Sequence, residues 1–141
     1  MADHPLPAER HVPLLDHLGI EPVEAGEGRA VFEMTVDDRH LRTLGLLHGG
    51  VTAALLDTAM GFAAVTVAPE GHHPVTIQIN VNFVRAVQEG ERLRARGEVR
   101  HSGRQTAVTF GEVQTSDGRL AATATATFLF VPVPAAEAGR G

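Results

Sequence analysis

The feature that most constrains this chain is the apolar stretch of residues 49–68, which reads GGVTAALLDTAMGFAAVTVA. It is too long for a strand and rich in Ala, Leu and Met, so it predicts a helix. This helix has almost no polar face, and a helix that is apolar nearly all round must be covered on most sides. The rest of the sequence therefore has to supply a layer that wraps it.

Alternating segments on both sides of the helix supply that layer. Apolar and polar residues alternate with a period of two over residues 29–36, 75–84, 91–101, 105–115 and 119–131, as is typical of half-buried strands. Asp117-Gly118 predicts a two-residue hairpin turn of type I′ between the last two strands. The order predicts an α+β domain in which a curved antiparallel sheet wraps around one long central helix.

The chain of 141 residues is long enough for one domain with a single core. We expect that domain to occupy residues 1–131, with a short helix in the segment VPLLDHLGI at residues 12–20. Residues 132–141 contain turn-forming residues and little to bury, so they predict a flexible tail.

Composition excludes several kinds of chemistry. The chain has no Cys, Lys, Tyr or Trp, which excludes thiol nucleophiles, Cys metal clusters and lysine Schiff bases. Its serines, Ser102 and Ser116, do not lie in a G-x-S-x-G elbow. His72 and His73 show no metal-ligand spacing with His40 or His101, so no metal is expected.

The net charge of −5 argues against binding to nucleic acid or to an anionic membrane surface. The N-terminus lacks the basic start and apolar core of a signal peptide. A membrane span over residues 51–69 is disfavoured by Asp57 and by the absence of flanking charge asymmetry. We therefore expect a cytoplasmic protein.

Asp57 stands alone in this apolar stretch as the only Asp, Glu, Lys or Arg side chain between Arg42 and Glu70. An unpaired buried carboxylate is costly, because apolar walls cannot replace its hydration. Most of its helical neighbours are small; those within about 60° are Gly50, Ala53, Ala54, Met60, Gly61 and Ala64. The small side chains around Asp57 therefore let a ligand or another backbone approach it closely. A buried acid whose hydrogen bonds are satisfied by a Thr or a backbone amide fits the pattern equally well.

The sequence His48-Gly49-Gly50 places two side-chain-free amides at the start of the helix. Such N–H groups, with the helix dipole, favour developing negative charge, although a glycine pair can equally serve as a backbone bend. Gly49 lies eight residues before Asp57, roughly 12 Å along the helix axis, too far for both to touch one atom. Either the helix begins later than Gly50 or a second chain supplies part of the site.

The segment HLRTLGLLHGGVTAALLDTAMGFAA resembles the signature of the hot-dog-fold acyl-CoA thioesterases of the phenylacetate-degradation type. The resemblance continues through TIQINVNFVRAVQEGERLRARGEV, HSGRQTAVTFGEV and DGRLAATATATFLF, and it covers about residues 28–131. It implies a hot-dog fold, a homodimer that shares its active sites, and commonly a homotetramer. It also implies acyl-CoA as the substrate and no metal or redox cofactor.

The resemblance also implies roles for individual residues. The Gly49 amide polarises the thioester carbonyl, and Asp57 acts as a general base on water or as a nucleophile. Thr76 matches a position where the partner subunit often contributes a Ser or Thr that positions the water. The implied product is a free acid, from an aryl-acetyl or a short or medium acyl group.

This chain departs from the family at Arg42, where Asn or Gln is usual. Arg42 either pairs with Asp57 or faces solvent or a phosphate of CoA; the second is favoured, because a tight ion pair would quench the base. His48 has two interpretations, and shaping the oxyanion loop by a hydrogen bond is preferred to direct acid–base catalysis.

The remaining candidates are predicted to bind substrate. Arg85, Arg100 and Arg104 are candidates for the CoA phosphates, and the turn His101-Ser102-Gly103-Arg104 is preferred among them. Phe83, Phe110 or Phe128 are candidates for the acyl group. The predicted substrate-binding residues are Arg42, Gly50, Gly61, Asn82, Arg85, His101, Ser102, Gly103 and Arg104. Two alternative functions stay open: a non-catalytic hot-dog module that binds acyl-CoA, and a hot-dog acyl-CoA dehydratase.

Overall fold

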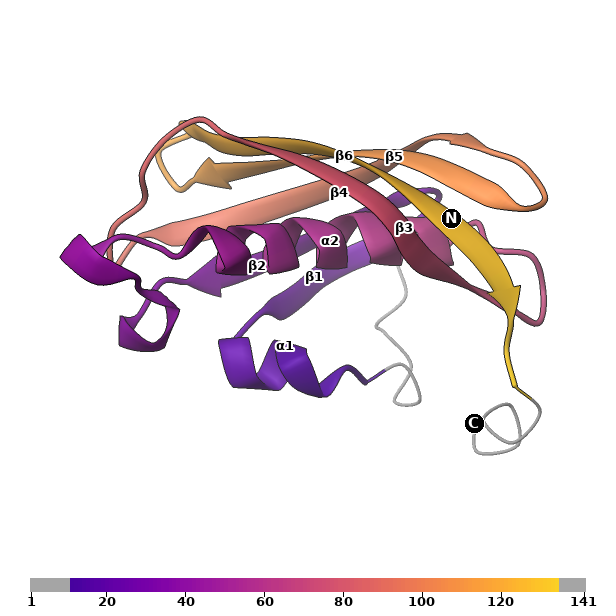
Figure 1. Ribbon diagram of the computed structural model, residues 1–141, viewed down its shortest axis with the longest axis horizontal. Helices are drawn as coiled ribbons and strands as arrows, with labels where there is room; N and C mark the ends of the chain where they lie inside the picture. The colour runs from indigo at the N-terminus through magenta and orange to yellow at the C-terminus, as the bar shows by residue number, and fades with distance from the viewer. Residues whose placement is uncertain (1–10, 135–141) are drawn as a thin grey trace.

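The computed structural model describes residues 11–134 as a curved, six-stranded antiparallel sheet against one long helix, α2. The strand order is β1-β2-β4-β5-β6-β3, and Figure 1 shows the sheet curving along α2. The α+β hot-dog architecture is therefore confirmed. The helices and strands are α1 (Pro13–Leu18), β1 (Glu21–Gly26), β2 (Arg29–Thr35), α2 (Gly49–Val65), β3 (His72–Phe83), β4 (Arg92–Ser102), β5 (Thr106–Thr115) and β6 (Leu120–Pro132).

Two short 3-10 turns, η2 (Asp38–His40) and η3 (Thr43–Gly45), lie between β2 and α2. They build the segment that leads into the first turn of the long helix. At the other end, β6 continues to Pro132, one residue into the predicted tail. Residues 135–141 of that tail lie outside the described residues.

Strand β1 was not predicted, because the sequence EPVEAG has no alternating pattern and most of the strand is exposed. It pairs with β2 through a tight turn at Glu27-Gly28, where both residues have positive φ, 53° and 78°. A type I′ turn requires this geometry. The type I′ hairpin therefore lies at Glu27-Gly28.

The prediction of a type I′ turn at Asp117-Gly118 is wrong. Of these two residues only Gly118 has a positive φ, 84°. The connection from β5 to β6 is wider, and it closes through the Thr115 N–H, which donates to the Arg119 carbonyl at 2.9 Å. The Thr115 hydroxyl also donates to Asp117, which holds this carboxylate inside the turn.

The core lies between α2 and the concave face of the sheet, and glycines allow the two to approach closely. A Cβ atom at Gly97 on β4 would lie 2.3 Å from the Ala59 carbonyl oxygen of α2. A Cβ atom at Gly111 on β5 would lie 3.0 Å from the Met60 side chain. The helix backbone therefore rests almost directly on β4, and small residues at these two positions set the spacing.

We predict that Gly97→Ala destabilises the protein by about 1–3 kcal/mol, because the added methyl group forces α2 away from the sheet. Gly103→Ala is the matched control, since nothing lies within 4 Å of a Cβ atom there. Urea unfolding of both variants measures the difference. Equal midpoints for the two variants would contradict the close approach of α2 to β4.

Candidate active site

The first turn of α2 leaves one backbone N–H group free. His48 is the N-cap, and its ring Nδ1 accepts a hydrogen bond from the Gly50 N–H at 2.8 Å. The His48 carbonyl accepts from the Val51 N–H at 3.0 Å. Within the part of the chain that the structure describes, the Gly49 N–H has no partner. The His48 ring thus hydrogen-bonds the backbone of the first turn, as the interpretation that it shapes this loop requires. The free N–H donor of the turn is that of Gly49.

Gly49 opens into a cavity of about 270 Å³ with mostly apolar walls. Two arginines, Arg42 and Arg85, also line it. The Arg42 side chain donates to the Thr43 hydroxyl at 3.1 Å and is exposed. The other lining residues are Leu46, Leu47, Thr52, Phe83, Val84, Ala86, Val87, Leu93, Val113 and Ala121.

Asp57 lines a second cavity, of about 370 Å³. Its side chain is half-buried, so the carboxylate reaches solvent through this cavity and is not a core acid. The Thr76 hydroxyl donates to Asp57 Oδ1 at 2.8 Å. Gly61 lies one helical turn further along α2 and also lines the cavity. The other lining residues are His11, Val12, Thr58, Phe62, Val65, His73, Pro74 and Phe128.

The two cavities have no residue in common. Because α2 is continuous from Gly49, the Gly49 amide and Asp57 are about 12 Å apart by helical rise. Of the two explanations for their separation, a late start of the helix is therefore wrong. One chain holds a free backbone N–H in one cavity and a carboxylate in another.

Arg42 does not pair with Asp57, since it lines the Gly49 cavity and not the Asp57 cavity. The resemblance implied that Thr76 reaches the site of a neighbouring chain. In this structure Thr76 donates to the Asp57 of its own chain, because the pairing of β3 with β6 places Thr76 opposite the cavity residue Phe128.

Several predicted substrate-binding residues lie elsewhere. Asn82 pairs with Thr123, between the buried Ala122 and Ala124, so it faces the outer side of the sheet. The segment His101-Ser102-Gly103-Arg104 is exposed where β4 ends and turns toward β5, and it lines neither cavity.

The three phenylalanines are also separated. Phe83 lines the Gly49 cavity and Phe128 the Asp57 cavity. Phe110 lies on the outer face, where the Arg100 guanidinium stacks 4.7 Å from its ring centre. Phe110 is therefore wrong as a candidate for contact with the acyl group in either cavity.

Sequence reasoning missed part of the wall around Asp57. Phe62 and Val65 lie on α2 itself, but five and eight residues after Asp57, outside the i+3 and i+4 positions, so helical spacing did not assign them to the Asp57 side. His11, Val12 and His73 come from other elements, and no local pattern connects them to Asp57.

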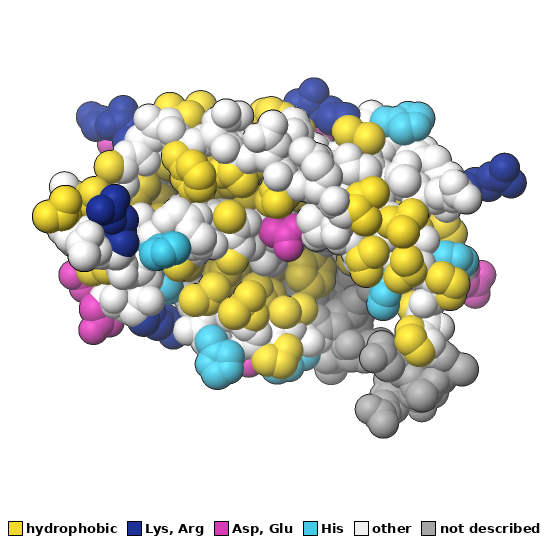
Figure 2. Space-filling view, in the orientation of Figure 1, with side chains coloured by type: hydrophobic (Ala, Val, Ile, Leu, Met, Phe, Trp, Pro, Cys, Tyr) yellow, Lys and Arg dark blue, Asp and Glu magenta, His cyan; other side chains and the backbone are white. Residues whose placement is uncertain are grey.

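Among residues 11–134, no group of three or more His, Asp or Glu side chains is arranged to hold a metal ion. No helix in the same range is long and apolar enough to cross a membrane. Figure 2 shows hydrophobic side chains gathered across the middle of one face of the molecule, with arginines toward its edges.

Comparison with known proteins places this geometry in a family. The model of a family described as the thioesterase superfamily matches residues 44–122. The proofreading thioesterase EntH of Cronobacter turicensis is 37% identical over 93 residues, which cover 66% of this chain and 67% of the relative. The PaaI protein of the E. coli phenylacetic acid degradation operon superposes with a TM-score of 0.79 at 30% identity, covering 84% of this chain and 83% of that chain.

A protein of Streptococcus pneumoniae described as a hypothetical thioesterase, whose structure was determined with coenzyme A, gives a TM-score of 0.75 at 27% identity. The superposition covers 80% of this chain and 86% of that chain. The chain belongs to the thioesterase superfamily, and it is a thioester hydrolase with a hot-dog fold. The resemblance to the phenylacetate-degradation type is thereby confirmed.

We predict that Thr76→Val slows thioester hydrolysis about tenfold, because it removes the hydroxyl group that orients Asp57. Thr76→Ser keeps a hydroxyl group and is expected to retain most of the rate. Steady-state kinetics on both variants provide the measurement. Equal rates for the Val and Ser variants would show that the hydrogen bond to Asp57 has no part in turnover.

Proposed function

We propose that the protein hydrolyses acyl-CoA thioesters to the free acid and CoA. The observation that carries this proposal is the unpaired Gly49 N–H, which opens into an apolar cavity at the N-terminus of α2. A donor in this position is suited to a carbonyl oxygen that gains negative charge during the reaction. The helix dipole adds to that stabilisation, because its positive end lies at the same point.

Asp57 supplies the second part of the chemistry. As a general base, it takes a proton from water while the water oxygen bonds to the thioester carbonyl carbon. The tetrahedral intermediate then breaks its C–S bond, and the electron pair leaves on the CoA sulfur. The proton held by Asp57 passes to that sulfur. The hydrogen bond from Thr76 fixes the carboxylate so that one oxygen stays directed into the cavity.

Asp57 acting as a nucleophile is the alternative chemistry, in which an acyl anhydride forms and is opened by water. A single turnover in isotopically labelled water separates the two mechanisms. Attack of water on the Asp57 side of the anhydride leaves labelled oxygen in Asp57. General-base catalysis places the label in the acid product.

Substrate binding is proposed to use both cavities. The structural relative that contains coenzyme A supports a CoA thioester as the substrate. Arg42 and Arg85 beside Gly49 offer guanidinium groups to the anionic CoA. Phe62, Val65 and Phe128 give the Asp57 cavity an apolar wall suited to an aryl-acetyl or a short or medium acyl group.

The site is proposed to be completed by a second copy of the chain. Strand β3 is an edge strand, and its apolar side chains are exposed, including Ile77 at 56% and Phe83 at 59%. Such an edge is a template for pairing with another chain. Pairing would let the Gly49 amide of one chain and Asp57 of the other serve one substrate. The tetrameric state and the cytoplasmic location remain predictions from the sequence.

We predict that Gly49→Pro removes the oxyanion donor and lowers kcat by about 10²–10³. Proline is well tolerated at the first position of a helix, and His48 before it has the extended conformation that proline favours. Gly49→Ala is the matched control, because it keeps the N–H and adds a methyl group near the Phe83 ring. If the two variants lose activity equally while both stay folded, Gly49 does not act through its amide.

A mixing experiment tests whether the site is shared between chains. Asp57→Asn and Gly49→Pro are each expected to be nearly inactive alone. Refolded together at equal concentrations, they should recover about a quarter of wild-type activity, because half of the dimers are mixed and each mixed dimer has one intact site. No recovery, with mixed dimers present by mass spectrometry, would show that each site uses residues of one chain.

A further inference from the structure

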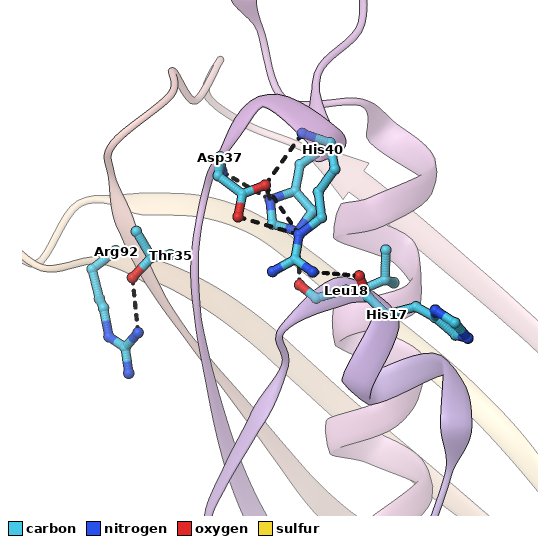
Figure 3. Close-up of polar contacts among 7 residues, drawn as sticks. His17, Leu18, Thr35, Asp37, His40 and Arg92 are labelled. Atoms are coloured by element: carbon cyan, nitrogen blue, oxygen red, sulfur yellow. Dashed lines mark hydrogen bonds and ion pairs between the residues drawn. The ribbon is translucent and has the colours of Figure 1, made fainter.

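His40 is fully buried and contacts three segments of the chain. Its ring Nδ1 accepts a hydrogen bond from the Asp37 N–H at 2.9 Å, and its ring Nε2 lies 2.7 Å from the Leu18 carbonyl at the end of α1. Its own carbonyl accepts from the His48 N–H at 2.9 Å. Figure 3 shows the His40 ring enclosed between the Asp37 loop and Leu18.

These partners fix the chemical form of the ring. A backbone N–H can only donate, so Nδ1 carries no proton. A backbone carbonyl can only accept, so Nε2 carries the proton. Both polar atoms of the ring are therefore used, and the Asp37 Oδ1 atom also lies 3.4 Å from Nδ1. The His40 ring lines neither cavity, so it cannot touch a substrate bound there.

A continuous series of hydrogen bonds connects this ring to the free amide. The hydrogen bonds of the ring fix His40 in η2, and the His40 carbonyl accepts a hydrogen bond from the His48 N–H. The His48 ring then caps the Gly50 N–H at 2.8 Å. The Gly49 N–H, between these two bonded amides, is left free to face its cavity.

We propose that His40 is a positioning residue that directs the Gly49 N–H toward the substrate carbonyl. The expected effect of His40 on kcat rests on the proposed function. Its expected effect on the orientation of the Gly49 N–H rests on the hydrogen bonds alone. An oxyanion donor must meet its acceptor closely in the transition state, so a small rotation of the peptide before Gly49 costs rate. His40 acts through His48 and makes no contact with the reacting atoms.

The neighbouring Arg39 offers a matched control. Its guanidinium donates to the His17 carbonyl at 2.6 Å, so it also ties α1 to this loop. It also binds the Asp37 carboxylate at 3.1 Å. Desolvation alone would raise the pKa of Asp37, but the hydrogen bonds from Arg39 hold that pKa below its usual value. Within the described chain Arg39 makes no direct hydrogen bond to His40 or His48, and it reaches the His40 ring only through Asp37.

The kinetic test compares three substitutions. His40→Leu removes both ring contacts, and we expect kcat to fall about 10–100-fold with KM changed no more than about twofold. His40→Asn places an amide oxygen near the position of Nδ1, so it should recover most of the lost kcat. Arg39→Gln should leave kcat unchanged. An equal loss for Arg39→Gln and His40→Leu would overturn the proposal, because it would show that only the attachment of α1 matters.

A double substitution tests whether His40 acts through Gly49. In a Gly49→Pro background there is no N–H to direct, so adding His40→Leu should produce no further loss of kcat. Losses that multiply would overturn the proposal. Rates are compared below the unfolding midpoint of each variant, which keeps a simple loss of stability from imitating the effect.

Amide hydrogen exchange provides a readout that does not depend on activity. His40→Leu should speed exchange at the His48 N–H and shift the NMR signals of Gly49 and Gly50, while Arg39→Gln should change neither. If wild-type protein hydrolyses no thioester, the proposed function fails but this measurement still decides the role of His40. If the His48 N–H is equally protected in His40→Leu, the positioning role is wrong even in an active enzyme.

Discussion

The rest of the structure depends on the close packing of α2 against the sheet. The helix backbone at Ala59 lies so near Gly97 that no side chain fits between them. Because this side of α2 is buried against the sheet, a polar group can reach solvent only from the opposite side of the helix. Asp57 occupies that side, so the packing that stabilises the fold also places the carboxylate in a cavity. The lone acid in an apolar helix is therefore explained without a buried charge.

A second constraint acts at the start of the same helix, where the first N–H groups have no acceptor within the helix. His48 satisfies two of them, through its ring and through its carbonyl. Gly49 keeps its N–H free because the helix offers it no carbonyl acceptor, and the His48 carbonyl belongs to the same trans peptide and points the opposite way. The absence of a side chain at Gly49 also keeps the approach open beside Phe83. Helix capping and the proposed oxyanion role of Gly49 thus use different donors of a single helical turn.

Local patterns predicted the central helix, five of the strands, Asp57 and the glycine pair, because each of these depends on residues near in sequence. Strand β1 was missed because its residues are mostly exposed and carry no alternation. The misplaced residues depend on pairing between distant strands. Asn82 faces outward because of its register with Thr123, and Thr76 reaches Asp57 because β3 returns along α2 through its pairing with β6. Spacing along the chain contains no information about that register.

The proposed sharing of one site between two chains restricts how two copies can pair. In a twofold dimer of the proposed kind, the Gly49 amide of each chain serves the same substrate as the Asp57 of the other, and the arrangement is repeated with the roles exchanged. The symmetry axis then passes near the middle of that interval, which falls at Ala53. The side chains there are small, since Gly50, Ala53 and Ala54 all lie on the Asp57 side of the helix, so two copies of α2 can approach closely. The small-residue face of the helix is therefore as necessary to the proposed shared site as the amide and the carboxylate at its two ends.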